Sequence, residues 1–447
     1  MNFRIKQLDK NYNSLNVFKL FNYDNNIYLD SAKLDSKLGR YSFIGVNVLS
    51  TFMSRGHDAY IDGNKVLGEP FEVLEKLISK YNIAYDSNIP FVGGLVGYFS
   101  YDMGRILEEL PDTSESFIDI PDSIFYLYEN IIIFDHENNK TYITALGFIE
   151  NSIENIYNTI LNKYSDEELE IELGAENTEF YSNFTKEEYI KAISSMREYI
   201  RNGDMYIANM TRDVWCDNYE DSFTIYEKLR TINPAPFAAY MDCGDFQIIS
   251  SSPERFMYVQ DRKAYTRPIK GTRPRGYNIE EDNKNREELI NSEKDKSELL
   301  MIVDLERNDL SKVCKASTVK VTELFKIEEY ATVFHLVSEI EGVLEDNVSS
   351  VRCIKECYPG GSITGAPKIR AMEIIEELEG LKRNIYTGCI GYFDIRGNCD
   401  FNIAIRTIIK KDNKAYFGVG GGITYESDAE AEWYETIDKA KALMRVL

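Results

Sequence analysis

Apolar and polar positions alternate with the two-residue period of β-strands through residues 1 to about 148. Between these strands, residues 70–81 predict a helix with proline in its first turn, and residues 93–98 predict a buried strand whose glycines allow close backbone approach. An antiparallel, sheet-rich amino-terminal part is therefore expected. The clearest alternating stretches are residues 41–46, 125–128, 131–134 and 141–144.

The second half of the chain combines strands with long helical patterns in no regular order. Residues 186–201 predict an amphipathic helix that ends near Gly203, and residues 285–310 predict another. A third helix begins around residues 364–368 and ends at Gly380. This mixture predicts an α+β fold, with large antiparallel β-sheets packed as a sandwich, helices on the outside and two halves sharing a core.

An acidic and polar stretch separates the two halves. We expect residues 1–163 to form a sheet-rich amino-terminal domain, residues 164–183 an acidic linker and residues 184–447 the catalytic domain. The chain has no internal repeat, and no GxGxxG motif opens a helix. A dinucleotide-binding fold is therefore not expected.

The last helix of the chain carries the most informative local pattern. A capping box at residues 427–430 predicts that the helix begins near Asp428. Glu432, Glu435 and Lys439 share one face, and a solvated Glu–Lys pair is the simpler interpretation of that face. The alternative is a Mg²⁺ site, because these carboxylates follow a glycine-rich strand end, residues 420–422, whose N–H groups can surround an anion. The predicted core-facing stripe consists of Trp433, Ile437, Ala440 and Met444.

The composition excludes several classes of partner. The chain has 51 Lys and Arg against 74 Asp and Glu, and this net charge of −23 argues against nucleic acid and anionic membranes as partners. No stretch approaches the roughly 18 apolar residues of a membrane span, and the start lacks the apolar core of a signal peptide. Seven scattered cysteines, none in a CxxC pair, suit a reducing compartment. A cytoplasmic protein is expected.

Three polar residues in apolar or glycine-containing surroundings are candidates for chemistry. Lys270 follows an apolar residue and precedes Gly271, and nearby arginines would lower the pKa of its amine, as a nucleophile requires. Glu298 lies beside the most apolar stretch of its helix, where a buried carboxylate would need a cation. His335 lies in an apolar strand, either as a core imidazole bound to the backbone or as a proton donor.

Taken together, these segments resemble the chorismate-utilising enzymes, and among them component I of the aminodeoxychorismate synthases. The resemblance covers nearly the whole chain, and so many matches in order leave little room for chance. The motifs are GGLVGYFSYD (93–102), SPERF (252–256), PIKGTRP (268–274), DLERNDL (304–310), GSITGAPK (361–368), DFNIAIRT (400–407) and the carboxyl-terminal stretch 432–439.

Within this family Lys270 is the discriminating residue, because anthranilate synthases typically carry alanine there. The resemblance implies that Lys270 attacks carbon 2 of chorismate, that the hydroxyl on carbon 4 leaves, and that ammonia then displaces the lysine. The product would be 4-amino-4-deoxychorismate, an intermediate of p-aminobenzoate and folate biosynthesis. The alternative is anthranilate synthase component I, which converts chorismate to anthranilate and pyruvate. No glutaminase motif is present, so ammonia is expected from a separate glutamine amidotransferase subunit.

The resemblance also implies the roles of individual site residues. Glu254 and His335 would be the acid–base residues at the leaving hydroxyl, and Mg²⁺ would be held by Glu298, Glu432 and Glu435. Ile207 stands where the amine-forming relatives often have glutamine, and its side chain cannot activate water. The expected substrate-binding residues are Gly271, Thr272, Thr364, Tyr386, Arg406, Gly420, Gly421, Gly422 and Lys439.

The amino-terminal part resembles the part of these enzymes that binds tryptophan. Asp30 replaces the glutamate that is usual in feedback-inhibited anthranilate synthases, so regulation by tryptophan is not expected even where the amino acid binds. The residues expected to line this pocket are Leu29, Ser31, Tyr41, Asn233, Pro234, Pro236 and Phe237.

Overall fold

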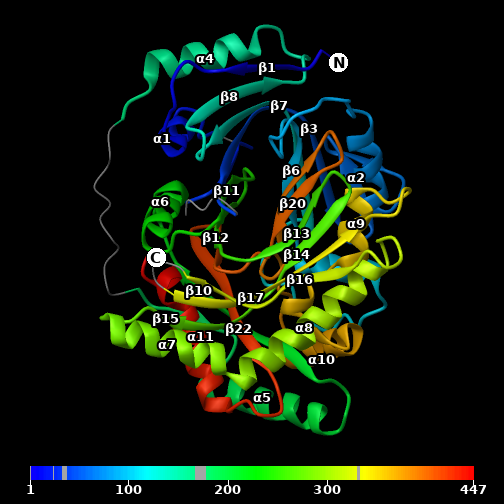
Figure 1. Cartoon of the computed structure of the whole chain (residues 1–447), viewed down its shortest axis with the longest axis vertical. Coiled ribbons are helices and arrows are strands. Elements are labelled where there is room, and N and C mark those ends of the chain that lie inside the picture. Colours follow the sequence, from blue (N-terminus) through cyan, green and yellow to red (C-terminus); the bar gives the residue numbers. More distant parts are fainter. Residues whose placement is uncertain (1, 24, 33–37, 167–177, 330–332) are drawn as a thin grey trace.

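The computed structural model of the chain describes residues 2–23, 25–32, 38–166, 178–329 and 333–447. Its named strands form one continuous antiparallel network that folds back on itself as two arms joined by a bend (Figure 1). The bend consists of β2 (Ile27–Asp30), β3 (Tyr41–Arg55), β6 (Gly94–Phe99) and β7 (Ser123–Asp135), extended by β8 (Lys140–Ala145) and β1 (Arg4–Gln7). The predicted strands of the first half are confirmed, and residues 125–128 and 131–134 belong to the single strand β7.

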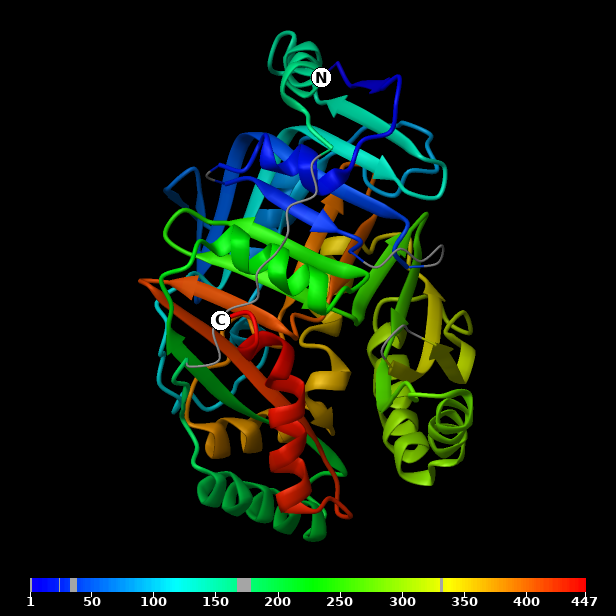
Figure 2. The ribbon, with the colours of Figure 1, turned by 90° about the vertical axis from the view of Figure 1, so that its left-hand side faces the viewer.

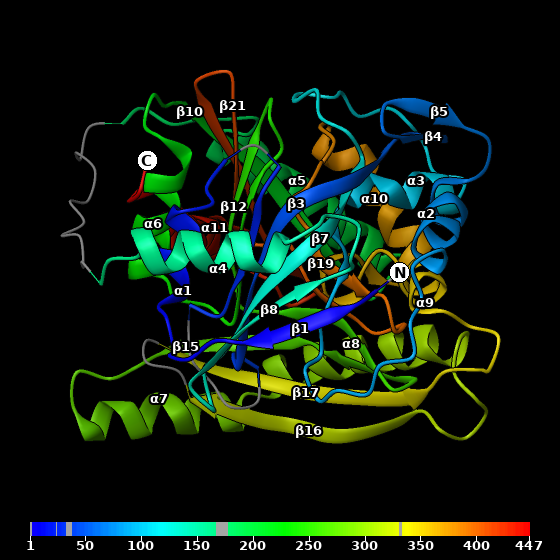
Figure 3. The ribbon, with the colours of Figure 1, turned by 90° about the horizontal axis from the view of Figure 1, so that it is seen from above.

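The first arm continues from β6 and ends at a three-stranded edge. Its strands are β19 (Cys389–Asp394), β20 (Cys399–Asn402), β13 (Arg255–Gln260), β14 (Lys263–Arg267) and β17 (Val333–Val343), with β15 (Ile269–Pro274) and β16 (Lys320–Glu329) also paired to β17. Seen from above, β16 and β17 lie at one side of the molecule and β10 and β21 of the second arm lie at the other (Figure 3).

The second arm continues from β2 in the same way. Its strands are β11 (Phe237–Asp242), β12 (Gln247–Ser252), β21 (Thr407–Lys411), β22 (Lys414–Ile423) and β10 (Ile207–Asp217), with β9 (Tyr181–Ser182) and β18 (Gly365–Ala366) paired to β10. Much of the predicted linker, residues 167–177, lies outside the described residues. Near the end of the predicted linker, Tyr181 and Ser182 pair with β10 and so belong to the second arm.

The helices lie on the outside of the two arms. The helices α5 (Lys186–Arg201) and α10 (Lys368–Glu379) confirm their predictions, and α2 (Pro70–Ser79) ends two residues earlier than predicted. The others are α1 (Ser14–Lys19), α3 (Gly104–Leu107), α4 (Ser152–Lys163), α6 (Ser222–Ile232), α7 (Ile279–Asn291), α8 (Glu293–Ser311), α9 (Ser350–Cys357) and α11 (Ala429–Met444). Figure 2 shows α11 in red and the pair α7–α8 in yellow-green, on different sides of the lower half.

Three details of the helix predictions are wrong. The single helix expected over residues 285–310 is two helices, because Ser292 adopts an extended conformation (φ −72°, ψ 105°) and its side chain caps α8 by accepting from the Asp295 N–H. In α11 the cap is Asp428 alone rather than a capping box. The buried face of α11 is Glu432, Thr436, Ala440 and Leu443. Of the expected stripe only Ala440 lies on this face, whereas Trp433, Ile437 and Met444 are half-buried, and Trp433 packs against Arg212 and Tyr189.

The core confirms that the two halves of the chain pack as one unit. Phe99 and Phe125 from the bend lie against Phe393 and Phe401 from the first arm, and Phe125 and Phe393 have ring centroids 5.6 Å apart. Their burial fixes the first arm against the bend. Within the described ranges no helix is both long and apolar enough to cross a bilayer.

Candidate active site

The ends of the two arms meet around Lys270. This residue lies on β15 at the edge of the first arm, and its Nζ donates to the Ser362 carbonyl oxygen over 3.2 Å. A Cβ atom placed on Gly422 of β22, in the second arm, would lie 3.2 Å from the same Nζ. The amine is thus held between segments that are about 150 residues apart in sequence.

Three glutamates face the same stretch of β22. A Cβ atom on Gly421 would lie 3.2 Å from Oε2 of Glu432 and 3.3 Å from Oε1 of Glu435, and one on Gly422 would lie 3.8 Å from Oε2 of Glu298. Because glycine has no side chain, Gly421 and Gly422 leave space beside the strand, and the carboxylates point into it. The residues that the sequence assigned to the metal, Glu298 of α8 and Glu432 and Glu435 of α11, thus lie along one stretch of β22.

Burial and neighbouring charges shift the pKa values of these carboxyl groups in opposite directions. Burial raises the pKa of Glu298 and Glu432, and Glu435 adds repulsion at Glu432. Burial would also raise the pKa of Glu435, but the Lys439 ammonium, with its Nζ 2.7 Å from Oε1, outweighs it and lowers that pKa. Lys439 also donates to the Gly420 carbonyl oxygen over 2.8 Å, which ties α11 to β22.

Glu254 and His335 lie on the first-arm side of this site. Burial raises the pKa of Glu254, and the Ser362 hydroxyl and the Lys270 ammonium only partly offset it, so the group is suited to carry a proton to a leaving oxygen. The Ile269 N–H donates to Oε1 of Glu254 over 3.4 Å. His335 lies opposite Thr272 in the β15–β17 pairing, and its Nδ1 is 2.9 Å from the Thr272 hydroxyl.

A second group of predicted residues surrounds the start of β21. Arg406 is partly buried, burial lowers its pKa, and its Nη1 donates to Oδ1 of Asn233 over 2.9 Å. In the part of the chain that the structure describes, Arg406 forms no ion pair with a carboxylate, so its charge is available to an anionic ligand. The Tyr386 ring covers Gly418 of β22, where a Cβ atom would overlap it at 2.2 Å. Thr364 is buried nearby, and its hydroxyl donates to the Gly360 carbonyl oxygen over 2.9 Å.

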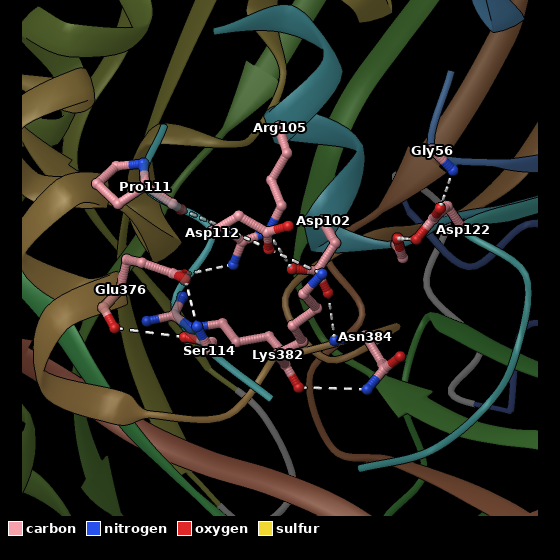
Figure 4. Close-up of polar contacts among 12 residues, drawn as sticks. Gly56, Asp102, Arg105, Pro111, Asp112, Ser114, Asp122, Glu376, Lys382 and Asn384 are labelled. Atoms are coloured by element: carbon pink, nitrogen blue, oxygen red, sulfur yellow. Dashed lines mark hydrogen bonds and ion pairs between the residues drawn. The ribbon is translucent and has the colours of Figure 1, made fainter. Parts of the chain in front are cut away.

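The amino-terminal half supports this group through a polar network (Figure 4). Asp102, the last residue of the GGLVGYFSYD motif, accepts the Asn384 N–H over 2.9 Å and Nε of Arg105 over 3.0 Å. Arg105 also pairs with Glu376 of α10. The turn that leads to Tyr386 is thus anchored to the other half of the chain. Sequence reasoning noticed the motif but missed this function, because Glu376 carries no local signal.

Comparison with known proteins gives this geometry its context. The signature of the chorismate binding enzymes matches residues 25–445. This chain belongs to the chorismate-binding enzyme family. It is 35% identical over 448 residues to anthranilate synthase component 1 of Aquifex aeolicus (strain VF5), covering 94% of this chain and 89% of that protein. It is 34% identical over 425 residues to aminodeoxychorismate synthase component 1 of Escherichia coli (strain K12), covering 94% and 92%.

A solved structure agrees with these relatives. The crystal structure of anthranilate synthase component I from Streptococcus pneumoniae TIGR4 matches with a TM-score of 0.82 at 32% identity, over 92% of this chain and 94% of that chain. The protein is therefore a chorismate-utilising enzyme of the anthranilate and aminodeoxychorismate synthase type. Relatives of both kinds are equally similar, so similarity alone does not select the reaction.

The glutamates of this chorismate-binding enzyme suit a divalent cation in their chemistry. Carboxylate oxygens are the ligands that Mg²⁺ prefers, and the glycine strand leaves room beside them. Among the described residues, no three acidic, imidazole or thiol side chains stand close enough to hold one ion in this conformation. Glu298, Glu432 and Glu435 would have to rotate toward one another to share it.

The charged surroundings of Lys270 differ from those expected from the sequence. The expected arginines are occupied by carboxylates of their own: Arg267 by Glu323, Glu328 and Glu339, Arg273 by Asp295 and Arg275 by Asp282. The charged groups that act on Glu254 and Glu298 include Lys270 itself, so the amine faces carboxylates. Each arginine has a closer partner in the fold, which the sequence spacing did not reveal.

The predicted tryptophan pocket coincides with a cavity of about 270 Å³ between the two halves. Leu29, Ser31, Tyr41, Pro236 and Phe237 line it, whereas Asn233 and Pro234 do not. Asn233 instead holds Arg406, because it ends α6 and its side chain lies beside β12 and the Arg406 turn.

Proposed function

We propose that this enzyme is aminodeoxychorismate synthase component I, which converts chorismate and ammonia to 4-amino-4-deoxychorismate for p-aminobenzoate and folate biosynthesis. The observation that carries the proposal is the Lys270 amine, which lies between the carboxylate cluster and the glycine strand, within reach of any ligand bound there. An amine in this place supplies the nucleophile that a two-step substitution of the ring hydroxyl requires.

The proposed reaction uses the first-arm residues for acid–base chemistry. The neutral Lys270 amine forms a bond to carbon 2 of chorismate, both ring double bonds shift, and the hydroxyl on carbon 4 leaves as water with a proton from Glu254. The lysine nitrogen then gives up one proton, which leaves a neutral secondary amine on carbon 2. His335, oriented by Thr272, is the second acid–base group. Ammonia then bonds to carbon 4, both double bonds shift back, and the lysine departs as a free amine, taking up a proton that the incoming nitrogen releases. The enolpyruvyl group stays on the ring, so no pyruvate is released.

Mg²⁺ is the proposed cofactor. Glu298, Glu432 and Glu435 would hold it, and when bound it would supply the positive charge that offsets the ring carboxylate in a site lined by glutamates. For the enolpyruvyl carboxylate, we propose Arg406, Tyr386 and the backbone N–H groups of residues 420–422. Gly271 gives the substrate access beside Lys270, Thr364 orients it, and Lys439 fixes the strand through its bond to Gly420.

A separate glutamine amidotransferase is the proposed source of ammonia. The relatives bear the name component 1, which implies a second component, and no glutaminase motif occurs in the sequence. The purified chain should therefore make product with ammonium salts and not with glutamine. Release of glutamate from glutamine by the chain alone would refute this part of the proposal.

A product assay tests the reaction itself. With chorismate, Mg²⁺ and ammonium, we expect 4-amino-4-deoxychorismate and neither pyruvate nor fluorescent anthranilate. Lys270→Ala should abolish the amino product, whereas Lys263→Ala, which removes an exposed lysine on the neighbouring β14, should not. Anthranilate synthase component I is the second candidate, supported by relatives of that name at 35% identity. Wild-type release of anthranilate and pyruvate would decide for it.

We propose that the cavity between the halves binds tryptophan without regulating the enzyme. Tyr41 and Phe237 offer aromatic walls for an indole ring. The Asp30 carboxylate, however, is already held by Arg230 over 2.6 Å and by Tyr226 over 2.9 Å, which reduces its capacity to capture an incoming amino group. L-tryptophan should raise Tm and leave kcat/KM unchanged, and inhibition by tryptophan would contradict the assignment.

A further inference from the structure

A lysine that the proposed reaction does not use lies between two of the glutamates. Lys294, in the first turn of α8, has its Nζ 3.8 Å from Oε1 of Glu298 and 3.8 Å from Oε1 of Glu432. Glu298 is on the same helix, whereas Glu432 is on α11, which packs on the second arm. The Lys294 amine therefore links the ends of the two arms where their carboxylates face each other.

Both carboxylates need positive charge nearby, and Lys294 acts on both of them. The side chains of Glu298 and Glu432 are 11% and 5% exposed, and a buried carboxylate without a cation is strongly unfavourable. In the described ranges, Lys294 is the only cation that forms an ion pair with either of them. The neighbouring acid, Asp295, does not compete for the amine, because Arg273 binds it over 3.0 Å.

The Lys294 ammonium lies where a divalent ion could displace it. At 3.8 Å from each oxygen it is beyond hydrogen-bond distance of both carboxylates, so it balances their charge without being fixed by either. The Lys294 side chain is 47% exposed and can turn into solvent. A divalent ion bound by the same two carboxylates would stand close to this ammonium and repel it.

We propose that Lys294 is the resident counter-cation of the site: it neutralises Glu298 and Glu432 in the metal-free enzyme and must leave when a divalent cation binds. The proposal rests on the Mg²⁺ site of the proposed function. Lys294 would then stabilise the arrangement of the two arms in the metal-free enzyme. It would also weaken the binding of a divalent ion when no substrate is present.

Mn²⁺ binding to the full chain without chorismate tests this inference. Free Mn²⁺ is measured by electron paramagnetic resonance for the wild type, Lys294→Met, Lys294→Arg and Lys296→Met. Lys296 is the matched control, because it lies on the same helix and its partner Glu293 is 90% exposed. We expect Lys294→Met to bind Mn²⁺ at least tenfold more tightly than the wild type, and the other two variants to stay within twofold of it. Lys294→Gln, with its fold checked by circular dichroism, repeats the charge removal with a polar side chain.

A second measurement follows the metal-free state. With a chelator present, Lys294→Met should have a lower Tm than Lys296→Met, and Mg²⁺ should raise its Tm by more than that of the wild type. Equal Mn²⁺ affinity in Lys294→Met and the wild type, with binding lost in Glu298→Gln, would overturn the role of Lys294 while leaving the metal site in place. Mn²⁺ binding in none of the variants, or binding unaffected by Glu298→Gln, would overturn the metal site together with this inference.

Discussion

Two adjacent glycines of β22 should respond differently to substitution by alanine: the change at Gly421 should affect activity, and the change at Gly420 should affect the stability of the fold. Gly421 has no positive φ, and a methyl group there would stand 3.2 Å from the Glu432 carboxylate and 3.3 Å from that of Glu435. Carbon–oxygen contacts of this kind need roughly 3.4 Å. Gly421→Ala therefore pushes both carboxylates outward by a few tenths of an ångström, and their side chains can move.

The neighbouring Gly420 provides the contrast. A methyl group there would stand 2.3 Å from the Met210 carbonyl oxygen, in the backbone of β10, which cannot move without breaking the β10–β22 pairing. We expect Gly420→Ala to cost about 3 kcal/mol or more of unfolding free energy, as overpacking does. Gly421→Ala should stay within about 1 kcal/mol of the wild type, because alanine is favoured over glycine in a strand by roughly that amount.

The assay combines urea unfolding with activity at varied Mg²⁺. A displacement of about 1 Å in a catalytic geometry costs about a hundredfold in rate, so a smaller shift should cost Gly421→Ala about tenfold in kcat/KM. The Mg²⁺ concentration for half-maximal activity should rise by a similar factor. Wild-type Mg²⁺ dependence in Gly421→Ala would refute the argument that this glycine makes room for the carboxylates, and a stable Gly420→Ala would refute the strand register.

Two further predictions concern buried acids. Asp102→Ala leaves Nε of Arg105 and the Asn384 N–H without their acceptor and should lower the unfolding free energy by about 3 kcal/mol in urea, while raising the KM for chorismate. Burial raises the pKa of Glu306, which accepts from Thr266, to about 8. The folded protein then keeps a proton that the unfolded chain releases, so stability falls as pH rises from about 5 to 8. The unfolding free energy of Glu306→Gln, relative to that of the wild type, should rise by about 1.4 kcal/mol per pH unit in this window and stay constant above it. If the two proteins lose stability in parallel as the pH rises, the prediction is wrong.

Local sequence signals predicted the elements well where the local and tertiary preferences agree. The capped amphipathic pattern of residues 186–201 is α5, and the alternating stretch 41–46 opens β3. The local signals were wrong where contacts between distant parts of the chain determine the structure. Ser292 breaks a helical pattern because its side chain is a better cap than helix interior. The buried face of α11 carries Glu432, which a hydrophobic stripe would never include, because that face adjoins the site.

The sequence by itself determined the kinds of groups that make up the proposed site: a lysine beside a glycine, glutamates on two helices, a glycine-rich strand and an arginine at a strand start. Tertiary structure alone decided which charges meet. Because the two arms fold back, Lys294 and Lys270 of the first arm lie against Glu432 and Gly422 of the second. The arginines near Lys270 in the sequence form ion pairs with other carboxylates. Charge interactions depend on distance and burial, and neither can be calculated from separation along the chain.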